Sequence, residues 1–297
     1  MSKLGATNLE KSLQEIKKRF AVVGREQESL TLLHCLLAGK NVLLEGPVGV
    51  GKTFLVHAVA SCLDRGVVRV DGDSRYTEQK LTGWFDPPSV LKKGYGKNSY
   101  FDGPLAQAMR NGSILFINEL NRMPEGVQNI LLPALDERKI EIPRVATLEA
   151  KAGFCVIATQ NPREFVATSH LSEALLDRFE LITLSYQKEE EEREILKQNT
   201  SYKEKGKNNE ALIEWCLSTI RETRESPLIK RGASIRAGIS LYDITQSMGG
   251  DAEAFSRAIE ISLPTRIELS EEGVELGIKK VLEQLQQNGK KKSQNKR

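Results

Sequence analysis

The chain has 297 residues, of which 39% are hydrophobic and 28% are charged. These values are typical of a globular protein with a sizeable core, and they exclude a largely disordered chain. The formal net charge is +3, but the last eight residues carry five positive and no negative charges, so the remainder has a net charge of −2. A body with this charge balance is not expected to bind nucleic acid.

Cysteine and histidine residues are few and widely spaced. The four cysteines and three histidines show neither CxxC nor HxxxH spacing, so we expect neither a structural zinc site nor a disulfide framework. No apolar run approaches the roughly 18 residues of a membrane span, and residues 1–20 lack the apolar core of a signal peptide. The expected location is therefore the cytoplasm.

The first part of the chain alternates helical patterns with short apolar runs. Leu9, Leu13, Ile16 and Phe20 recur at helical spacing, and a second helix is expected over residues 26–37. Five apolar runs are predicted to be strands: Asn41–Glu45, Val67–Val70, Ile114–Ile117, Phe154–Ala158 and Leu181–Leu184. Strands that alternate with helices predict an α/β fold with a parallel sheet covered on both faces.

Two segments interrupt this alternation. Residues 75–101 contain three glycines and two prolines and are too long for an ordinary connection, so we expect an inserted, partly mobile element. The stretch Lys139–Lys151 follows a long helix that is predicted to end near Arg138, and it alternates apolar and polar residues. That alternation predicts a projecting hairpin.

From Gln187 onwards the sequence shows no strand pattern and predicts helices only. The expected helices are Glu189–Tyr202, Glu210–Glu225, Ser234–Met248, Asp251–Ser262 and Glu271–Gln286. We therefore expect an α/β domain over residues 1–186 and a smaller all-helical domain over 187–289. Residues 290–297 are interpreted as a disordered basic tail.

A phosphate-binding motif, GxxxxGK[ST], stands between the first predicted strand and a helix expected over Thr53–Leu63. It comprises Gly46, Pro47, Val48, Gly49, Val50, Gly51, Lys52 and Thr53. Its glycines let backbone N–H groups converge on the β-phosphate, Lys52 would bridge the β- and γ-phosphates, and Thr53 would coordinate Mg²⁺. Phe54, the next residue, is included in the predicted site. A glycine-rich turn with an exposed lysine is the alternative, but the strand–helix context favours the phosphate loop.

The predicted strand Ile114–Ile117 is followed by two polar residues, Asn118 and Glu119. A nucleotide hydrolase needs a magnesium-orienting group and a water-polarising carboxylate at such a strand end. Glu119 is the candidate for that carboxylate. The alternative is an acid that interacts with the dipole of a following helix.

The sequence resembles the MoxR family of AAA+ ATPases over nearly its whole length. Five sequence blocks occur in the same order and spacing as in that family. The blocks are Gly46–Thr53, Phe116–Arg122, Thr159–Pro162, Leu171–Phe179 and Gly232–Ala237. The resemblance implies a five-stranded parallel αβα sandwich with a helical lid, ATP and Mg²⁺ as cofactors, and a homo-hexameric ring. Residues 75–101 and 139–152 resemble the family's helix-2 insert and pre-sensor hairpin.

The resemblance also implies roles for two residues near the predicted sheet. Asn161 resembles the sensor-1 residue, which orients the attacking water; alone, an Asn-Pro pair is more often a turn former. Arg178 resembles the arginine finger that acts on the nucleotide of an adjacent subunit. The alternative for Arg178 is a surface salt bridge with Asp177 or Glu173.

Two further assignments rest on the resemblance. Arg236 resembles the sensor-2 arginine, which couples the lid to the γ-phosphate, although Ile235 stands where the family usually has proline. Val22, Val23 and Gly24 resemble the adenine-side contact. Outside the resemblance these three residues would be an ordinary apolar turn.

Asn118 departs from the family pattern, in which the magnesium-side residue of this strand is normally aspartate. An amide keeps one oxygen that can accept from a metal-bound water but loses the charge and the second oxygen. This departure bears on magnesium affinity and turnover and not on nucleotide binding. One hypothesis is that Asn118 slows hydrolysis, and the alternative is that Glu119 or Asn121 compensates.

The sequence is thus interpreted as an ATP-hydrolysing, chaperone-like remodelling protein of the MoxR type. The resemblance implies a partner with a von Willebrand A domain, or a metal-containing enzyme whose assembly it assists. A gas-vesicle or carboxylase-activating ATPase of the same clade remains an alternative. So does a nucleotide-gated scaffold with little turnover, whereas a DNA motor is disfavoured by the net charge of −2.

Overall fold

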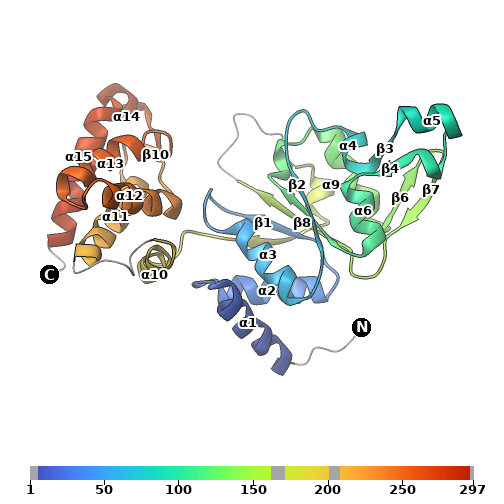
Figure 1. The fold of residues 1–297 in the computed structure, drawn as a ribbon, viewed down its shortest axis with the longest axis horizontal. Coiled ribbons are helices and arrows are strands. Elements are labelled where there is room, and N and C mark those ends of the chain that lie inside the picture. The colour runs from blue at the N-terminus through green and yellow to red at the C-terminus, as the bar shows by residue number, and fades with distance from the viewer. Residues whose placement is uncertain (1–5, 162–170, 201–207, 295–297) are drawn as a thin grey trace. The chain divides into compact units, whose positions relative to one another are not determined.

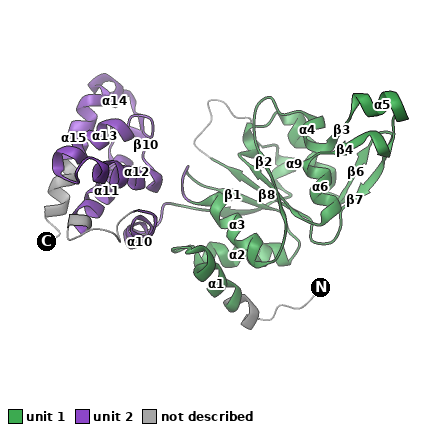
Figure 2. Cartoon of the chain, in the orientation of Figure 1, with its two compact units in different colours: residues 1–47, 51–185 green, residues 48–50, 186–297 purple. Residues whose placement is uncertain are grey.

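The computed structural model describes residues 6–161, 171–200 and 208–294 (Figure 1). Pro162 of the third sequence block and Tyr202, the expected end of one helix, lie outside these ranges. The chain divides into two compact units, the first of residues 1–47 and 51–185 and the second of residues 48–50 and 186–297 (Figure 2).

A five-stranded parallel sheet forms the centre of the described part of the first unit, with the strand order β2-β5-β8-β1-β9. The strands are β1 (Val42–Glu45), β2 (Val67–Asp71), β5 (Ile114–Asn118), β8 (Cys155–Gln160) and β9 (Glu180–Thr183). The central strands β1, β5 and β8 are nearly continuous apolar runs, as expected for strands buried on both faces. The predicted five-stranded parallel αβα fold is confirmed.

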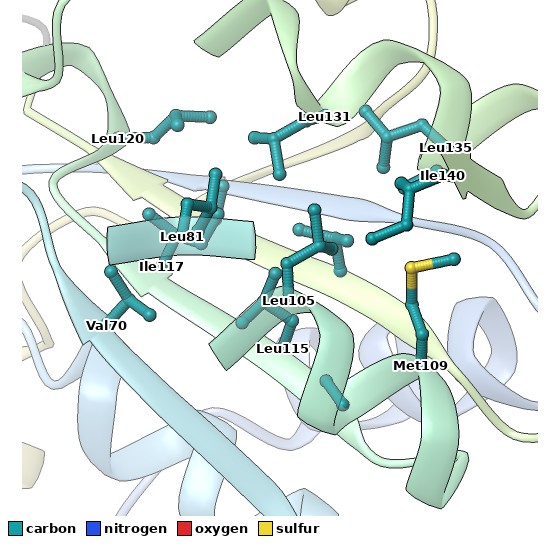
Figure 3. Close-up of a cluster of buried hydrophobic side chains, with 14 of the residues drawn as sticks. Val70, Leu81, Leu105, Met109, Leu115, Ile117, Leu120, Leu131, Leu135 and Ile140 are labelled. Atoms are coloured by element: carbon teal, nitrogen blue, oxygen red, sulfur yellow. The ribbon is translucent and has the colours of Figure 1, made fainter. Parts of the chain in front are cut away.

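Helices cover both faces of this sheet (Figure 1). Helices α1 (Ala6–Phe20), α2 (Glu26–Leu37) and α3 (Lys52–Cys62) pack against one another, and α3 contacts β5. On the other face, α6 (Pro104–Asn111) covers a buried apolar cluster. Figure 3 shows Leu105 and Met109 of α6 in this cluster, close to Leu115 and Ile117 of β5. Because alternate strand residues face opposite sides, Phe116 of β5 points instead towards α3, where its ring meets His57.

Short elements make up the two segments that interrupt the alternation. Between β2 and α6 the chain forms α4 (Glu78–Thr82), β3 (Gly83–Phe85), α5 (Pro87–Lys93), η1 (Lys97–Ser99) and β4 (Tyr100–Asp102). Strands β3 and β4 pair antiparallel. Strands β6 (Lys139–Ile142) and β7 (Ala146–Glu149) form an antiparallel hairpin.

The prediction of one long helix that ends near Arg138 was wrong. The chain forms three short pieces there: η2 (Leu120–Arg122), α7 (Glu125–Asn129) and α8 (Leu131–Asp136). Pro133 lacks a backbone N–H and cannot donate to the carbonyl of Asn129, four residues earlier. The helical pattern is therefore interrupted between α7 and α8. A further short helix, α9 (Glu173–Leu176), precedes β9.

The second unit is mainly helical. Its helices are α10 (Glu189–Asn199), α11 (Asn208–Glu225), α12 (Ile235–Ser247), α13 (Ala252–Ser262), α14 (Glu271–Leu276) and α15 (Ile278–Gln294). They enclose a separate apolar core that includes Leu217, Ile220, Leu241, Tyr242 and Phe255.

Three expectations for this unit were wrong. Strands β10 (Ile229–Arg231) and β11 (Glu268–Leu269) form an antiparallel pair, too short to show a strand period in the sequence. The helix expected over 271–286 is broken at Gly277, whose φ of 88° is left-handed. The backbone of α15 is helical as far as residue 294, where a disordered tail was expected from residue 290.

Two further observations concern the whole described chain. Within the described ranges, no helix combines the length and the apolar character that a membrane crossing requires. The four cysteines, all within those ranges, are free thiols.

Candidate nucleotide site

The carboxyl ends of parallel strands meet at one edge of a sheet, which is where open α/β sheets bind ligands. In the first unit this edge gathers the chain after β1, β2, β5 and β8. Most of the residues that the sequence analysis singled out lie there. Arg178, Arg236 and the Val22–Gly24 turn lie elsewhere in the chain.

The phosphate loop leaves β1 at Glu45 and enters α3 at Lys52. Gly51 stands at the N-cap of α3 with a φ of 93°, a left-handed conformation that favours glycine. As a glycine it offers no side chain to the first backbone N–H groups of this 11-residue helix. Those N–H groups and the helix dipole suit a phosphate group, so the local backbone fits the predicted ligand.

The Lys52 ammonium lies over the start of the loop. Its Nζ donates to the carbonyl oxygen of Gly46 at 2.6 Å and to that of Pro47 at 3.0 Å. Thr53 follows on the first turn of α3 and is half-buried, while Phe54 is exposed. A cation and a hydroxyl are thus placed at the N-terminus of the same helix, as Mg²⁺-nucleotide binding requires.

Residues at the ends of three neighbouring strands form a continuous chain of hydrogen bonds. The Glu119 backbone N–H donates to Thr159 Oγ1 at 2.8 Å, and the Thr159 hydroxyl donates to Asn118 Oδ1 at 3.0 Å. Asn118 Nδ2 in turn donates to Asp71 Oδ1 at 3.0 Å. The chain therefore crosses from β8 through β5 to the edge strand β2.

Asp71 ends this chain as an ionised group. Arg69, two residues earlier on the same face of β2, donates to both carboxylate oxygens at 2.7 to 3.2 Å. The Arg69 guanidinium, and then the Asn118 amide, lower the pKa of Asp71 below its usual value. Asp71 could not be predicted from the sequence, and Thr159 was named only as part of the third block, because strand pairing alone places them beside Asn118.

Glu119 occupies a strained position directly after β5. Its φ of 57° is left-handed, which is uncommon for a residue with a side chain, and it turns the chain into η2. The Glu119 carboxylate accepts a hydrogen bond from Arg122 Nη1 at 2.8 Å. Strain at a strand end of this kind is typical of functional sites, but the candidate base is already paired within its own chain.

Asn161 lies immediately after β8 and is buried, with 6% of its surface exposed. Before it, Gln160 donates to the Glu45 carboxylate at 2.7 Å, which joins the ends of β8 and β1. The structure therefore brings Asn161 to the same sheet edge as Glu119. Its sensor role stays a prediction.

Arg178 follows α9 and pairs within its own chain. Its guanidinium forms an ion pair with Asp136 at the end of α8 and donates to the carbonyl oxygen of Ala174. A surface salt bridge was the alternative considered for Arg178, but its partner is Asp136 and not Asp177 or Glu173. The hydrogen bond to Asp136 raises the pKa of Arg178.

Arg236 belongs to the second unit, where it is the second residue of α12 and is exposed. The segment before it is anchored to α11: the Ala233 N–H donates to Thr223 Oγ1, and Arg224 Nε donates to the Ala233 carbonyl, both at 2.8 Å. Arg224 is held in turn by Glu192, which is 1% exposed. The start of α12 therefore has a fixed internal position in this unit.

The residues predicted to contact adenine form the turn between α1 and α2. Val22 and Val23 are buried at 9% and 8% exposure, and Gly24 has a φ of 65°. Their burial fits an ordinary core turn as well as a base contact. The adenine role stays a prediction.

The described residues offer no cluster of three or more histidine, cysteine, aspartate or glutamate side chains that could hold a metal ion. Magnesium in a phosphate loop is instead held mainly by a hydroxyl and by the nucleotide itself. Thr53 on the first turn of α3 fits that requirement.

Comparison with known proteins identifies the domain that carries this site. Residues 41–179 match the family model described as AAA domain (dynein-related subfamily). Among solved structures, a point mutant of RuvB from Thermotoga maritima has 21% identity and a TM-score of 0.56 over 81% of this chain and 71% of that chain. A candidate ATPase from Cytophaga hutchinsonii has 24% identity and a TM-score of 0.52 over 95% of each chain. These structural likenesses show the fold.

Sequence relatives extend beyond this domain. The uncharacterized protein YeaC of Bacillus subtilis is 28% identical over 261 residues, which cover 80% of this chain and 78% of YeaC. The uncharacterized protein YojN of the same organism is 30% identical over 236 residues, which cover 77% of this chain and 76% of YojN. The chain therefore belongs to the same family as YojN, and its residues 41–179 match the AAA domain of the dynein-related subfamily.

Proposed function

We propose that this protein binds ATP with Mg²⁺ and hydrolyses it to ADP and phosphate. The observation that carries the proposal is the Lys52 ammonium held over the loop at the N-terminus of α3, at the sheet edge where Glu119 and Asn161 also lie. A bound magnesium ion would neutralise charge on the β- and γ-phosphates. Thr53 would coordinate it directly, and Asn118 would act through a metal-bound water.

The chain's own groups would divide the remaining work. Backbone N–H groups of the loop and Lys52 would bind the phosphates, and Glu119 would polarise the attacking water. Asn161 would orient that water. Arg122 occupies Oε2 of the Glu119 carboxylate, and the attacking water would be polarised by Oε1 or by Oε2 after Arg122 has moved away.

We further propose that the protein works as a homo-hexameric ring of the MoxR type, a remodelling chaperone in the cytoplasm. Arg178 would then leave Asp136 and reach the nucleotide of a neighbouring subunit. Residues 75–101 would be the helix-2 insert, residues 139–152 the pre-sensor hairpin, and the second unit a lid that carries Arg236. The five sequence blocks support this proposal, and they suggest a partner with a von Willebrand A domain or a metalloenzyme client.

A nucleotide-gated scaffold is the second candidate. Two observations favour it: the amide at Asn118 and the pairing of the Glu119 carboxylate with Arg122. A scaffold would bind ATP with the same loop and release phosphate only slowly. A gas-vesicle or carboxylase-activating ATPase would share the catalytic residues and differ in its client.

Steady-state phosphate release with and without Mg²⁺ separates the enzyme from the scaffold. We expect magnesium-dependent turnover in the natural protein and retained ATP binding without turnover in Glu119→Gln. Glu125→Gln is the matched control, because Glu125 is an exposed residue of α7 a short distance along the chain. Turnover that is absent from the natural protein, or unchanged in Glu119→Gln, would contradict the hydrolytic role assigned to this residue.

A further inference from the structure

We propose that Asp71 is a positioning residue of the nucleotide site: it fixes the amide orientation of Asn118, and its charge is the reason why residue 118 is an asparagine. The consequence for hydrolysis rests on the proposed function, whereas the pairing itself does not. The proposal also replaces the hypothesis that Asn118 is simply a weakened aspartate.

Register and sheet geometry bring the two side chains together. Asp71 is the last residue of β2, Asn118 is the last residue of β5, and they are Cα partners in the parallel ladder. Phe116, two residues before Asn118, contacts His57 of α3 with ring centroids 6.0 Å apart. Side chains two apart on a strand share a face, so the pair lies on the face of the sheet that carries the phosphate-loop helix.

The donors and acceptors around Asn118 allow one orientation of its amide. An ionised carboxylate only accepts hydrogen bonds, so Asp71 faces the amide NH₂. On the other side, the Thr159 oxygen accepts from the Glu119 N–H, which leaves its own proton for Asn118 Oδ1. Asn118 Oδ1 therefore points towards β8, the strand next to β1 and its phosphate loop.

A flipped amide would fail on the Asp71 side, where its oxygen would face the carboxylate without a proton between them. The Thr159 hydroxyl, which has a second lone pair, could rotate to accept from a flipped NH₂, so Asp71 is the partner that fixes the orientation. Asp71 cannot easily turn away, because Arg69 holds both of its oxygens. The carbonyl oxygen of Asn118 keeps one lone pair beyond the Thr159 bond, and that lone pair can accept from a metal-bound water.

The same geometry disfavours an aspartate at position 118. A second carboxylate would meet Asp71 at the 3.0 Å that now separates a donor from an acceptor, and two like charges at this distance repel. This repulsion would also disturb the hydrogen bond between residue 118 and Thr159, and with it the position of the Glu119 backbone. The negative charge of this pair is thus carried by Asp71, at the end of the neighbouring strand β2.

A charge swap tests the proposal directly. The variants are Asn118→Asp, Asp71→Asn and the double variant Asp71→Asn/Asn118→Asp, which exchanges the two groups and restores one donor facing one acceptor. Asp73→Asn combined with Asn118→Asp is the matched control, because Asp73 lies two residues further on and pairs with Arg75. The readouts are the melting temperature without nucleotide, and kcat and KM for ATP.

We expect Asn118→Asp to lower the melting temperature and to reduce kcat by about tenfold, the effect of losing one charge-assisted hydrogen bond, with little change in KM. The swap should recover most of both losses, and the Asp73→Asn combination should recover neither. Asn118→Asp protein that melts and turns over like the natural protein, or faster, overturns the proposal. The proposal is also overturned if the double variant recovers no more melting temperature or kcat than the control does. It is overturned as well if the double variant recovers the melting temperature but not kcat.

Failure of the Asp71–Asn118 pairing can be distinguished from failure of the proposed ATPase activity. If the natural protein does not hydrolyse ATP, the proposed enzyme fails, and the melting temperatures of the four proteins still measure the coupling between Asp71 and Asn118. Absence of coupling in those temperatures overturns the pairing whether or not the protein is an ATPase.

Discussion

Arg122 holds the carboxylate of Glu119: its Nη1 donates to Glu119 Oε2 at 2.8 Å, three residues along the chain. The two side chains are 49% and 31% exposed, so the pair is weak enough to break during a catalytic cycle. The candidate base is therefore kept in place by a partner that water can displace.

Replacing Arg122 with alanine should raise turnover by releasing Glu119. A half-exposed ion pair contributes about 0.2–1 kcal/mol, so we expect kcat to increase by up to about fivefold, with little change in melting temperature. Arg75→Ala, which removes a comparable surface pair with Asp73, is the control and should leave kcat unchanged. A lower kcat in Arg122→Ala would show that the arginine itself contributes to the reaction.

Gly72 allows β2 to approach the backbone at Glu119. Its N–H donates to the Asn118 carbonyl at 2.7 Å, and a Cβ at this position would lie 2.1 Å from the Glu119 carbonyl oxygen. Gly72→Ala should therefore separate the two strand ends, destabilise the first unit by about 1–3 kcal/mol and reduce turnover. Thermal unfolding and phosphate release measure the two effects.

Gly126→Ala is the control for this substitution. An added Cβ at Gly126 meets nothing within 4 Å, and alanine is the better helix former within α7. This variant should be neutral or slightly more stable than the natural protein. Equal behaviour of the two alanine variants would contradict the close approach at Gly72.

Glu192 should be a major source of stability in the second unit. Its carboxylate is 1% exposed and forms ion pairs with Arg224 at 2.8 Å and Arg221 at 3.1 Å. Glu192→Gln leaves the Arg224 guanidinium, 11% exposed, without its buried counter-ion, while Arg221 keeps Glu189 at 3.8 Å, so we expect a cost of about 3 kcal/mol. Chemical denaturation should show this loss in the transition of the second unit. Glu253→Gln, which breaks an exposed pair with Arg257, should cost no more than about 0.5 kcal/mol, and a similar cost for both would refute the assignment.

Activity should depend on assembly if Arg178 acts on a neighbouring nucleotide. Arg178→Ala and Lys52→Ala proteins should each be inactive alone, and a mixture should regain turnover, because an intact loop can then meet an intact arginine. Mixing Lys52→Ala with Glu119→Gln is the control and should regain none, since both residues serve their own subunit's site. Full activity in a protein that sediments as a monomer would exclude the proposed role of Arg178 at a neighbouring subunit's nucleotide.

Local patterns sufficed for the strands and for the phosphate loop. Each strand of the parallel sheet is a short apolar run, and Gly46–Thr53 lies within one contiguous stretch of sequence. The site around Asn118 could not be predicted in the same way, because its partners are 47 residues away at Asp71 and 41 residues away at Thr159. Only the pairing of β2, β5 and β8 brings them together.

Other differences between the predicted and the observed structure arise where the sequence pattern was too short or too local to be informative. The expected long helix is interrupted between α7 and α8, where Pro133 removes a backbone donor. Strands β10 and β11 have three and two residues, fewer than any periodic pattern can reveal. The alternative considered for Arg178 was a salt bridge with a neighbour in sequence, whereas the structure pairs it with Asp136, 42 residues away.

Equilibrium binding of ATP to the natural protein and to Lys52→Ala tests the central claim most directly. Removal of the ammonium group deprives two phosphates of a charge-assisted contact worth about 1.5–3 kcal/mol each, so we expect the dissociation constant to rise by at least a factor of about 100. Lys92→Ala, at an exposed lysine of α5, should bind ATP as the natural protein does. Unchanged affinity in Lys52→Ala would contradict the assignment of residues 46–53 as the nucleotide site.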